Sequence, residues 1–245
     1  MSRIRGVFFD LGGTLFRYPP RRTGSGGIGY VMSQFGIDAS GEEIGAAWRK
    51  ASAEAGQYYN AQPYFLHKDL FRASVTNFLE QFGHTPDETV LDTFHATQLQ
   101  GMVDHLPIRD ECISSLVALR EQGLYLSIVS NIDDDYLDPL VEKYALHDYL
   151  DHWTSSEEAQ SCKPDPGIYH YCLEKAGLAK EEVLFVGDSL HHDVAGAAGV
   201  GMRSARIVEE GVTTPLTDGL EASAEPTYVI RSLDELIPII EENNV

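Results

Sequence analysis

Residues 8–16 read FFDLGGTLF, so an acidic side chain, a pair of glycines and a hydroxyl follow a hydrophobic run. The run starts at Ile4, and its apolar composition predicts a buried strand that ends before the glycine pair at Gly12. This places Asp10 at the carboxyl end of the strand. A carboxylate there can attack an electrophilic centre or bind a hard cation, and the plain structural alternative is that it caps a following helix.

Two other apolar runs end in polar residues in the same way. Residues 124–129 are followed by Ser130 and Asn131, and residues 183–186 are followed, after one glycine, by Asp188. Three strands thus each lead into a polar or acidic residue.

Helical patterns connect these runs. Residues 109–122 and 165–176 carry apolar side chains at helical spacing and stop at glycines: Ile113, Leu116 and Val117 before Gly123, and Ile168, Tyr171 and Cys172 before Gly177. Further strands are predicted at 203–208 and 227–230, and Ser232 with Glu235 predicts a capping box for a closing helix. Alternating strands and helices specify an α/β fold with a parallel sheet, which binds ligands at the carboxyl ends of its strands.

The stretch between residues 16 and 104 has no convincing strand. Its composition predicts helices at 41–59, 67–82 and 86–103, and residues 19–27 (PPRRTGSGG) resemble a linker. We therefore expect two domains, an all-helical one at 16–104 inserted into an α/β core formed by 1–15 and 105–245.

The 245 residues include 18 Lys and Arg against 38 Asp and Glu, which gives a formal net charge of −20. This charge repels phosphate backbones and anionic lipids, and no basic run offsets it, so nucleic-acid and membrane partners are disfavoured. Three cysteines without a CxxC pair argue against a disulfide framework and a zinc site. No apolar run is long enough for a signal or membrane segment, so we expect a cytoplasmic protein of open oligomeric state.

A second acidic centre follows the third strand, where Asp188 and Asp193 lie five residues apart. Facing Asp10, they would form an oxygen-rich and strongly negative site that a cation would relieve. Mg²⁺ suits such a site because it keeps several waters and takes few carboxylates. A helix cap at Asp188 and a solvated Asp193 explain each residue separately, but they do not explain the three acids together.

Polar and cationic groups complete the candidate site. Thr14 offers a hydroxyl that could orient Asp10 or a phosphoryl group. Ser130 and Asn131 offer a hydroxyl, an amide and backbone N–H groups. Lys163, in SCKPDP, could neutralise the nucleophile and bind a phosphoryl oxygen, although a solitary lysine is more often a surface residue.

Four motifs resemble, in order, those of the haloacid dehalogenase superfamily: FFDLGGTL at 8–15, IVSN at 128–131, CKPDP at 162–166 and VGDSLHHDVAGA at 186–197. The resemblance implies a flavodoxin-like Rossmannoid core with a helical cap inserted between the first two motifs. It also implies that Asp10 is the nucleophile and that Ser130 and Lys163 bind the transferred group. It further implies that Asp188 and Asp193 bind the metal.

Position 12 departs from the family's pattern. Phosphatases of the family usually carry a second Asp there, as acid for the leaving alcohol and then as base for water, whereas this chain has Gly12. The family's metal contact at this position is the main-chain carbonyl, which Gly12 keeps. General acid–base help is worth about 10²–10⁴-fold, so phosphate-ester hydrolysis is expected to be slow unless another group substitutes.

These features favour a Mg²⁺-dependent hydrolase that transfers the phosphoryl group of a small phosphorylated metabolite to Asp10. Two other functions stay open: a binding or regulatory homologue with weakened turnover, and cleavage of a carbon–heteroatom bond. The family's dehalogenases usually bear an aromatic residue where Gly12 sits and need no metal. Its phosphonate hydrolases use a cap lysine, and the surroundings of Lys50 and Lys68 do not resemble that motif.

Overall fold

The computed structural model describes residues 2–18, 26–210 and 224–244. The chain forms two compact units, one of Met1–Tyr18 with Pro107–Val245 and the other of Pro19–Leu106. We call them the α/β unit and the helical unit. The linker predicted at 19–27 lies outside the described residues except for its last two positions, which begin a helix.

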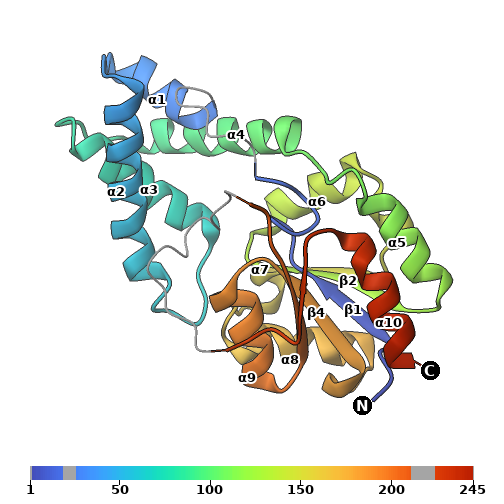
Figure 1. Cartoon of the computed structure of the whole chain (residues 1–245). Helices are drawn as coiled ribbons and strands as arrows, with labels where there is room; N and C mark the ends of the chain where they lie inside the picture. Colours follow the sequence, from blue (N-terminus) through green and yellow to red (C-terminus); the bar gives the residue numbers. More distant parts are fainter. Residues whose placement is uncertain (1, 19–25, 211–223, 245) are drawn as a thin grey trace. The chain divides into compact units, whose positions relative to one another are not determined.

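The α/β unit contains a six-stranded sheet in the order β3-β2-β1-β4-β5-β6 (Figure 1). The strands are β1 (Gly6–Phe9), β2 (Tyr125–Ser130), β3 (His152–Ser155), β4 (Val183–Gly187), β5 (Arg203–Ile207) and β6 (Tyr228–Ile230). Every neighbouring pair is parallel. The predicted α/β fold with a parallel sheet is therefore confirmed.

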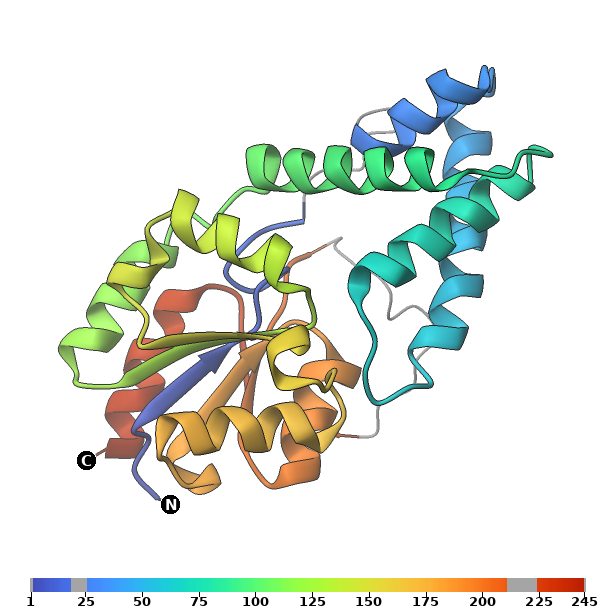
Figure 2. The same ribbon diagram turned by 180° about the vertical axis from the view of Figure 1, so that it is seen from behind.

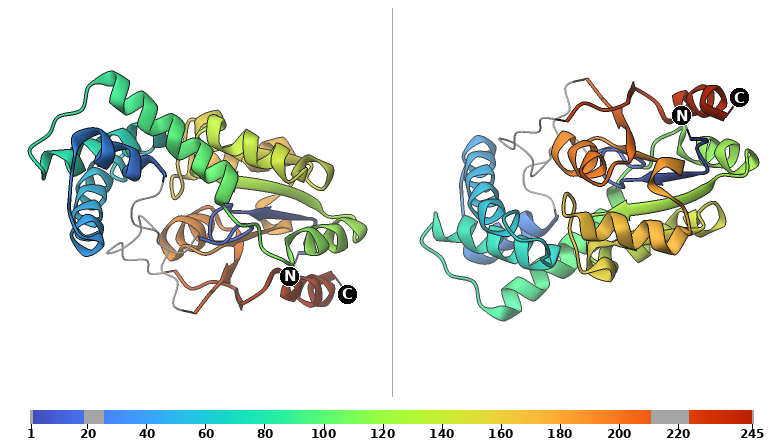
Figure 3. Two further views of the ribbon diagram at one scale, coloured as in Figure 1. Left: turned by 90° about the horizontal axis from the view of Figure 1, so that it is seen from above. Right: turned by 90° about the horizontal axis from the view of Figure 1, so that it is seen from below.

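Helices lie on both sides of this sheet (Figure 3). They are α5 (Cys112–Glu121), α6 (Asp134–Lys143), α7 (Ser156–Ala159), α8 (Pro166–Ala176), α9 (Gly196–Val200) and α10 (Leu236–Asn244). Short helical turns complete the unit: η1 (Leu146–Asp148), η2 (Lys180–Glu182), η3 (Leu190–Ala195) and η4 (Leu233–Glu235). Helices α5 and α10 lie side by side, as do α8 and α9 (Figures 1 and 2). All residues of β1 and β4 are buried, as expected for strands covered on both faces.

Strand β1 occupies the middle of the sheet. Val7 pairs with Leu126 of β2 on one side and with Leu184 of β4 on the other. The chain adds β2 and β3 to one side and then crosses to β4, so the strand order reverses between β1 and β4. Parallel sheets bind ligands beyond the strand ends at such a switch point, and Asp10 and Asp188 follow these two strands.

Two core elements differ from the sequence predictions. Strand β3 has the sequence HWTS, which lacks a buried apolar run, and it forms at the edge of the sheet with one paired neighbour. In α5 the apolar core face consists of Cys112, Leu116 and Leu119, whereas Val117, predicted to share that face, is 37% exposed. The helix is therefore rotated relative to the expected pattern.

The predicted capping box at Ser232 is wrong. The Ser232 side chain makes no cap bond and instead donates to Oε1 of Glu111, on the neighbouring helix segment. Glu235 accepts from the backbone N–H of Arg231, one residue before the expected donor. A tertiary contact has replaced the local cap.

The helical unit consists of α1 (Gly26–Phe35), α2 (Gly41–Tyr59), α3 (His67–Glu80) and α4 (Glu88–His105), and its described residues form no strand. A capping box between Ser40 and Glu43 starts α2. The four helices bury an apolar core of their own that includes Val31, Val75 and Phe94. Among the described helices of the whole chain, none combines the length and apolar character that a membrane crossing requires.

Candidate active site

Three carboxylates meet at the carboxyl ends of the two central strands. Asp10 follows β1, Asp188 follows β4, and Asp193 lies in the η3 turn. Each contributes one carboxylate oxygen, and these oxygens lie within 4.8 Å of one another. Asp10 and Asp193 are buried and Asp188 is partly buried. The fold thus brings together acids that come from two separate loops.

Lys163 lies between two of these carboxylates. Its Nζ atom is 2.6 Å from Oδ1 of Asp10 and 2.7 Å from Oδ1 of Asp193, and its side chain is 1% exposed. Burial opposes the charge of this ammonium group, but the two carboxylates together raise the pKa of Lys163 above its ordinary value. Lys163 is therefore a fixed positive charge beside Asp10.

The pKa of the Asp10 carboxyl group differs from the ordinary value of an aspartate. Burial raises the pKa of Asp10 from 3.8 to about 6, although the ammonium group of Lys163 acts in the opposite direction. The nearby carboxylate of Asp193 adds to the rise. The group needs further positive charge to ionise as readily as a carboxylate in water.

Asn131 is a positioning group for Lys163. Its side-chain Nδ2 donates to the main-chain oxygen of Lys163 at 2.8 Å, and its Oδ1 accepts from the main-chain N–H of Lys163 at 2.6 Å. The amide therefore binds both backbone groups of one residue 32 positions away. The sequence predicted Asn131 at the site, and the structure places its side chain on the backbone that carries the lysine.

Two hydroxyl residues predicted at the site are both buried near Asp10. Thr14 lies one turn after Asp10, and its Oγ1 is 3.5 Å from Oδ2 of Asp10, a long contact. Ser130 is the last residue of β2, the direct neighbour of β1.

The η3 turn fixes Asp193. The main-chain N–H of Ser189 donates to Oδ2 of Asp193 at 2.9 Å, while Oδ1 of Asp193 faces Lys163. Val194 donates to the main-chain oxygen of Ser189, the wider spacing of a π-helical turn, which is frequent at functional sites. Gly187 has to be a glycine, because a Cβ atom there would lie 2.2 Å from Cγ of Asp193.

Tyr18 is a residue at this site that the sequence patterns did not indicate. Its hydroxyl donates to the main-chain oxygen of Gly12 at 2.9 Å. A Cβ atom at position 12 would lie 3.4 Å from Cε1 of the Tyr18 ring and 3.7 Å from the hydroxyl oxygen. Burial and then the charge of Asp188 raise the pKa of Tyr18 above its ordinary value.

Two arginines that sequence analysis did not single out hold the main chain of the site. Arg109, whose side chain is 2% exposed, donates to the carbonyls of Thr14 and Gly13 at 2.8 Å each and pairs with Glu209 at 3.0 Å. Arg206 donates from Nε to the carbonyl of Asp188 at 3.1 Å. Because these contacts join residues far apart in sequence, no local pattern could have predicted them.

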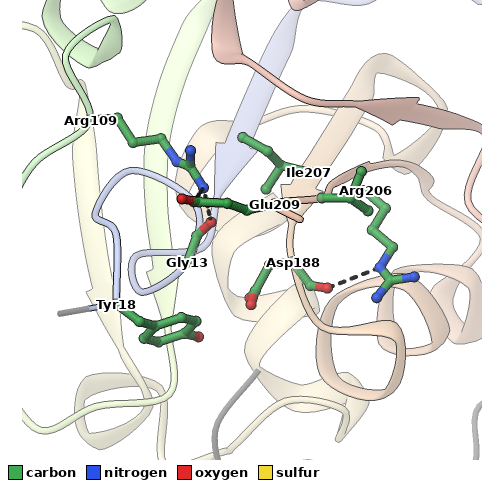
Figure 4. Close-up of a pocket in the computed structure, with 8 residues that line it drawn as sticks. Gly13, Tyr18, Arg109, Asp188, Arg206, Ile207 and Glu209 are labelled. Carbon is green, nitrogen blue, oxygen red and sulfur yellow. Dashed lines mark hydrogen bonds and ion pairs between the residues drawn. The ribbon is translucent and has the colours of Figure 1, made fainter. Parts of the chain in front are cut away.

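These groups surround a small pocket beside the acidic residues (Figure 4). It encloses about 90 Å³, and Tyr18, Arg109, Asp188, Arg206 and Glu209 are among the residues that line it. Figure 4 shows Arg109 and Arg206 on opposite sides, with Gly13, Glu209 and Asp188 between them. The carbonyls bound by Arg109 and Arg206 belong to the loops that carry Asp10 and Asp188.

The donor atoms are those a hard divalent cation prefers. Within the described part of the chain, the cluster that could hold a metal contains three carboxylates and neither cysteine nor histidine. With all groups ionised, three carboxylates and the ammonium of Lys163 leave a charge of −3 + 1 = −2. Such oxygen ligands with an excess of two negative charges fit Mg²⁺. Asp10, Asp188 and Asp193 are the groups available to it.

Comparison with known proteins gives matches along the chain. Residues 4–201 match the haloacid dehalogenase-like hydrolase family. The phosphoglycolate phosphatase of Pectobacterium atrosepticum is 26% identical over 243 residues, which cover 98% of this chain and 94% of that protein.

Two solved structures are similar over nearly the whole chain. The L-2-haloacid dehalogenase from Xanthobacter autotrophicus, with chloropropionic acid covalently bound, has a TM-score of 0.70 and 26% identity over 97% of this chain and 98% of its own. A hydrolase from Bacillus subtilis bound to magnesium has a TM-score of 0.76 at 18% identity, covering 98% and 99%. The second likeness concerns the fold alone.

Proposed function

The chain belongs to the haloacid dehalogenase-like hydrolase family, and on this basis we propose that it is a Mg²⁺-dependent phosphatase acting on a small phosphorylated metabolite. The observation that carries the proposal is the cluster of Asp10, Asp188 and Asp193 with Lys163 inserted between two of them. A site with a strong excess of negative charge can bind an anionic phosphoryl group only with the help of a cation. The phosphatase named among the chain's relatives supports this choice.

Asp10 is the proposed nucleophile. One of its carboxylate oxygens would attack phosphorus in line with the leaving oxygen, forming an aspartyl phosphate and releasing the rest of the substrate. Lys163 holds Oδ1 of Asp10 at 2.6 Å, which leaves Oδ2 for the attack and keeps a positive charge beside the transferred oxygens. Thr14 and Ser130 would orient the carboxylate and the phosphoryl group. Asn131 positions Lys163 through its backbone.

Asp10, Asp188 and Asp193, with the carbonyl of Gly12, would hold Mg²⁺, which when bound neutralises charge on the nucleophile and on the phosphoryl oxygens. Water would then attack the aspartyl phosphate and regenerate the Asp10 carboxylate, with one of its hydrogens staying on inorganic phosphate and the other released as the proton that balances protonation of the leaving oxygen. Each round consumes one ester and one water.

The helical unit is the proposed cap domain, corresponding to the insertion expected at residues 16–104. Its residues would select the leaving group and exclude bulk water during the reaction. It has a separate apolar core, so it can act as a body of its own. We propose a cytoplasmic location on the sequence features given above.

A second candidate activity is hydrolysis of a carbon–halogen bond, favoured by the likeness to the Xanthobacter dehalogenase. Asp10 would then attack carbon instead of phosphorus and release halide. The three-carboxylate cluster argues against this reaction, because it serves a cation that halide displacement does not need. Halide release that is insensitive to EDTA would identify the dehalogenase.

The test is phosphate release from a panel of phosphorylated metabolites with Mg²⁺, comparing wild type, Asp10→Asn and Asp234→Asn. Asp234 is an exposed acid in the η4 turn, so its variant controls for the loss of one charge. We expect activity in wild type and in the control, and none in Asp10→Asn or with EDTA. A wild type that binds Mg²⁺ but releases neither phosphate nor halide would be a binding or regulatory protein, and the enzyme proposal would fail.

A further inference from the structure

Position 12 lies two residues after Asp10, the proposed nucleophile. Gly12 has no side chain, and Tyr18 fills the adjacent space, with its ring in van der Waals distance of any Cβ added there. The Tyr18 hydroxyl directs its proton to the carbonyl of Gly12 at 2.9 Å. The Tyr18 hydroxyl is therefore hydrogen-bonded to the main chain two residues after Asp10, and the Asp188 carboxylate also interacts with it.

The other proton donors of the α/β unit around Asp10 are also engaged. Lys163 points its ammonium group at Asp10 and Asp193, at 2.6 and 2.7 Å. Arg109 donates to two main-chain carbonyls and to Glu209. The Thr14 hydroxyl also faces Asp10, with its Oγ1 3.5 Å from Oδ2 of that residue. The Tyr18 hydroxyl, the Lys163 ammonium and the Arg109 guanidinium thus all donate to groups of the α/β unit itself.

We propose that Tyr18 and Gly12 together make this a site for phosphoryl donors whose leaving group departs as a stable anion, such as acyl, enol and aryl phosphates. The inference rests on the proposed function and narrows its substrate class. The Asp10 oxygen forms its bond to phosphorus as the bond to the leaving oxygen breaks, and the leaving group takes the electron pair as carboxylate, enolate or phenolate. Charge accumulates on that oxygen because phosphoryl transfer passes through a loose transition state. Without a proton donor, simple alkyl phosphates react slowly.

The experiment measures kcat/KM for a series of aryl phosphates, from a dinitrophenyl ester to phenyl phosphate, together with one alkyl phosphate. This ratio reports the steps up to leaving-group release, so slow hydrolysis of the aspartyl phosphate does not mask the effect. We expect kcat/KM to fall by about 10²–10⁴-fold from the most acidic phenol to the alcohol, the range that general acid catalysis typically supplies. Similar values for all esters would overturn the inference while leaving the phosphatase proposal intact. Failure of every ester in the series, and of acetyl phosphate tested beside them as an acyl phosphate, would overturn the phosphatase proposal itself.

Two variants test the roles of Tyr18 and Gly12 in this selectivity. Tyr18→Phe keeps the ring and removes the hydroxyl, so the dependence on the leaving group should stay as steep as in wild type. A steeper dependence would identify the hydroxyl as a proton donor and overturn the inference. The double variant Gly12→Asp with Tyr18→Ser adds a carboxyl group and makes room for it. In this double variant, kcat/KM should depend less steeply on the acidity of the leaving group, with the largest increase in kcat/KM for the alkyl phosphate. An unchanged dependence would contradict the role given to position 12.

Discussion

Lys163 is the residue on which the electrostatics of the site depend. A buried ion pair contributes little net stability, but removing one partner leaves an uncompensated buried charge. Here one ammonium group serves two carboxylates, Asp10 and Asp193, so its loss leaves both of them unpaired. The metal-free protein should be especially sensitive to this position.

We expect Lys163→Met to lower the free energy of unfolding by about 3–5 kcal/mol in EDTA. Mg²⁺ should restore part of that loss, because it supplies positive charge to the same carboxylates. The control is Lys50→Met, since Lys50 is 65% exposed and its substitution should change stability by less than about 1 kcal/mol. Urea unfolding with EDTA and with Mg²⁺ measures both. Equal losses in the two variants would contradict the burial of Lys163 between the acids.

Asp10 gives a prediction about pH. Because the pKa of Asp10 is raised to about 6, the folded protein binds this proton more tightly than the unfolded chain, whose value is near 3.8. The ionised group therefore costs stability above about pH 6, and the cost disappears as the pH falls towards 3.8. In EDTA, the stability of Asp10→Asn relative to wild type should be greater at pH 8 than at pH 4.5, by about 2 kcal/mol. Denaturant unfolding at the two pH values measures this difference, and a constant offset would contradict the raised pKa.

At the scale of single residues, the sequence predicted the charged members of the site better than the groups around them. Asp10, Asp188, Asp193 and Lys163 stand in motifs with distinctive local spacing, and the structure brings them together. Tyr18 is different, since its contact with Gly12 depends on how the chain turns after β1. No periodicity or composition reports such a turn.

The loop after β1, which carries Asp10, is held by side chains from other segments of the chain. Its carbonyls at Gly13 and Thr14 accept from the guanidinium group of Arg109, which lies near the start of the second segment of the α/β unit. Glu209, after β5, pairs with the same guanidinium. The loop after β1 is thus held by segments that precede α5 and follow β5.

Arg109→Ala should lower the free energy of unfolding by about 2–4 kcal/mol, because two buried carbonyls lose their donors. The loop would also lose definition beside Asp10, so phosphatase activity should fall more than stability alone explains. Arg120→Ala is the matched control, because Arg120 also donates to a main-chain carbonyl and pairs with an acid but is 46% exposed. It should cost less than about 1 kcal/mol. Urea unfolding and kcat/KM are measured on both variants, and equal losses in the two would contradict the role of Arg109 in holding the loop.

Among the elements, those with long apolar runs or strong helical composition could be predicted. β1, β2 and β4 are buried on both faces and show it in sequence, and α2 spans the predicted 41–59. Strand β3 could not be found, because its four polar and aromatic residues become a strand only by pairing with β2. The predicted cap of the last helix is wrong, because the Ser232 side chain donates a hydrogen bond to Glu111 and makes none to its own helix.

The whole molecule carries a net charge of −20, and its three clustered acids concentrate negative charge at one place. The effect of salt on stability, which comes from general charge screening, should therefore be distinguishable from the effect of Mg²⁺ binding at this one site. Salt screens the whole surface and has no saturation point tied to one site, whereas Mg²⁺ at a single site saturates.

We expect Mg²⁺ to raise the melting temperature along a saturable curve, by about 5–10 °C at a hundredfold excess over its Kd. Asp188→Asn should shift the curve to higher Mg²⁺ or abolish it, because the site loses one charged ligand. The effect should persist in a background of NaCl at matched ionic strength. A rise that NaCl reproduces in both proteins would show general screening and no specific site.

The order of the strands also affects how the chain reaches its folded state. β1 lies near the beginning of the sequence, yet Val7 pairs with residues 126 and 184. A ribosome therefore releases an apolar strand long before either neighbour has been translated. The nascent chain must keep this strand from aggregating, by chaperone binding or by temporary contacts, until β4 has left the exit tunnel. Truncated translation products that stop before β4 cannot complete the centre of the sheet.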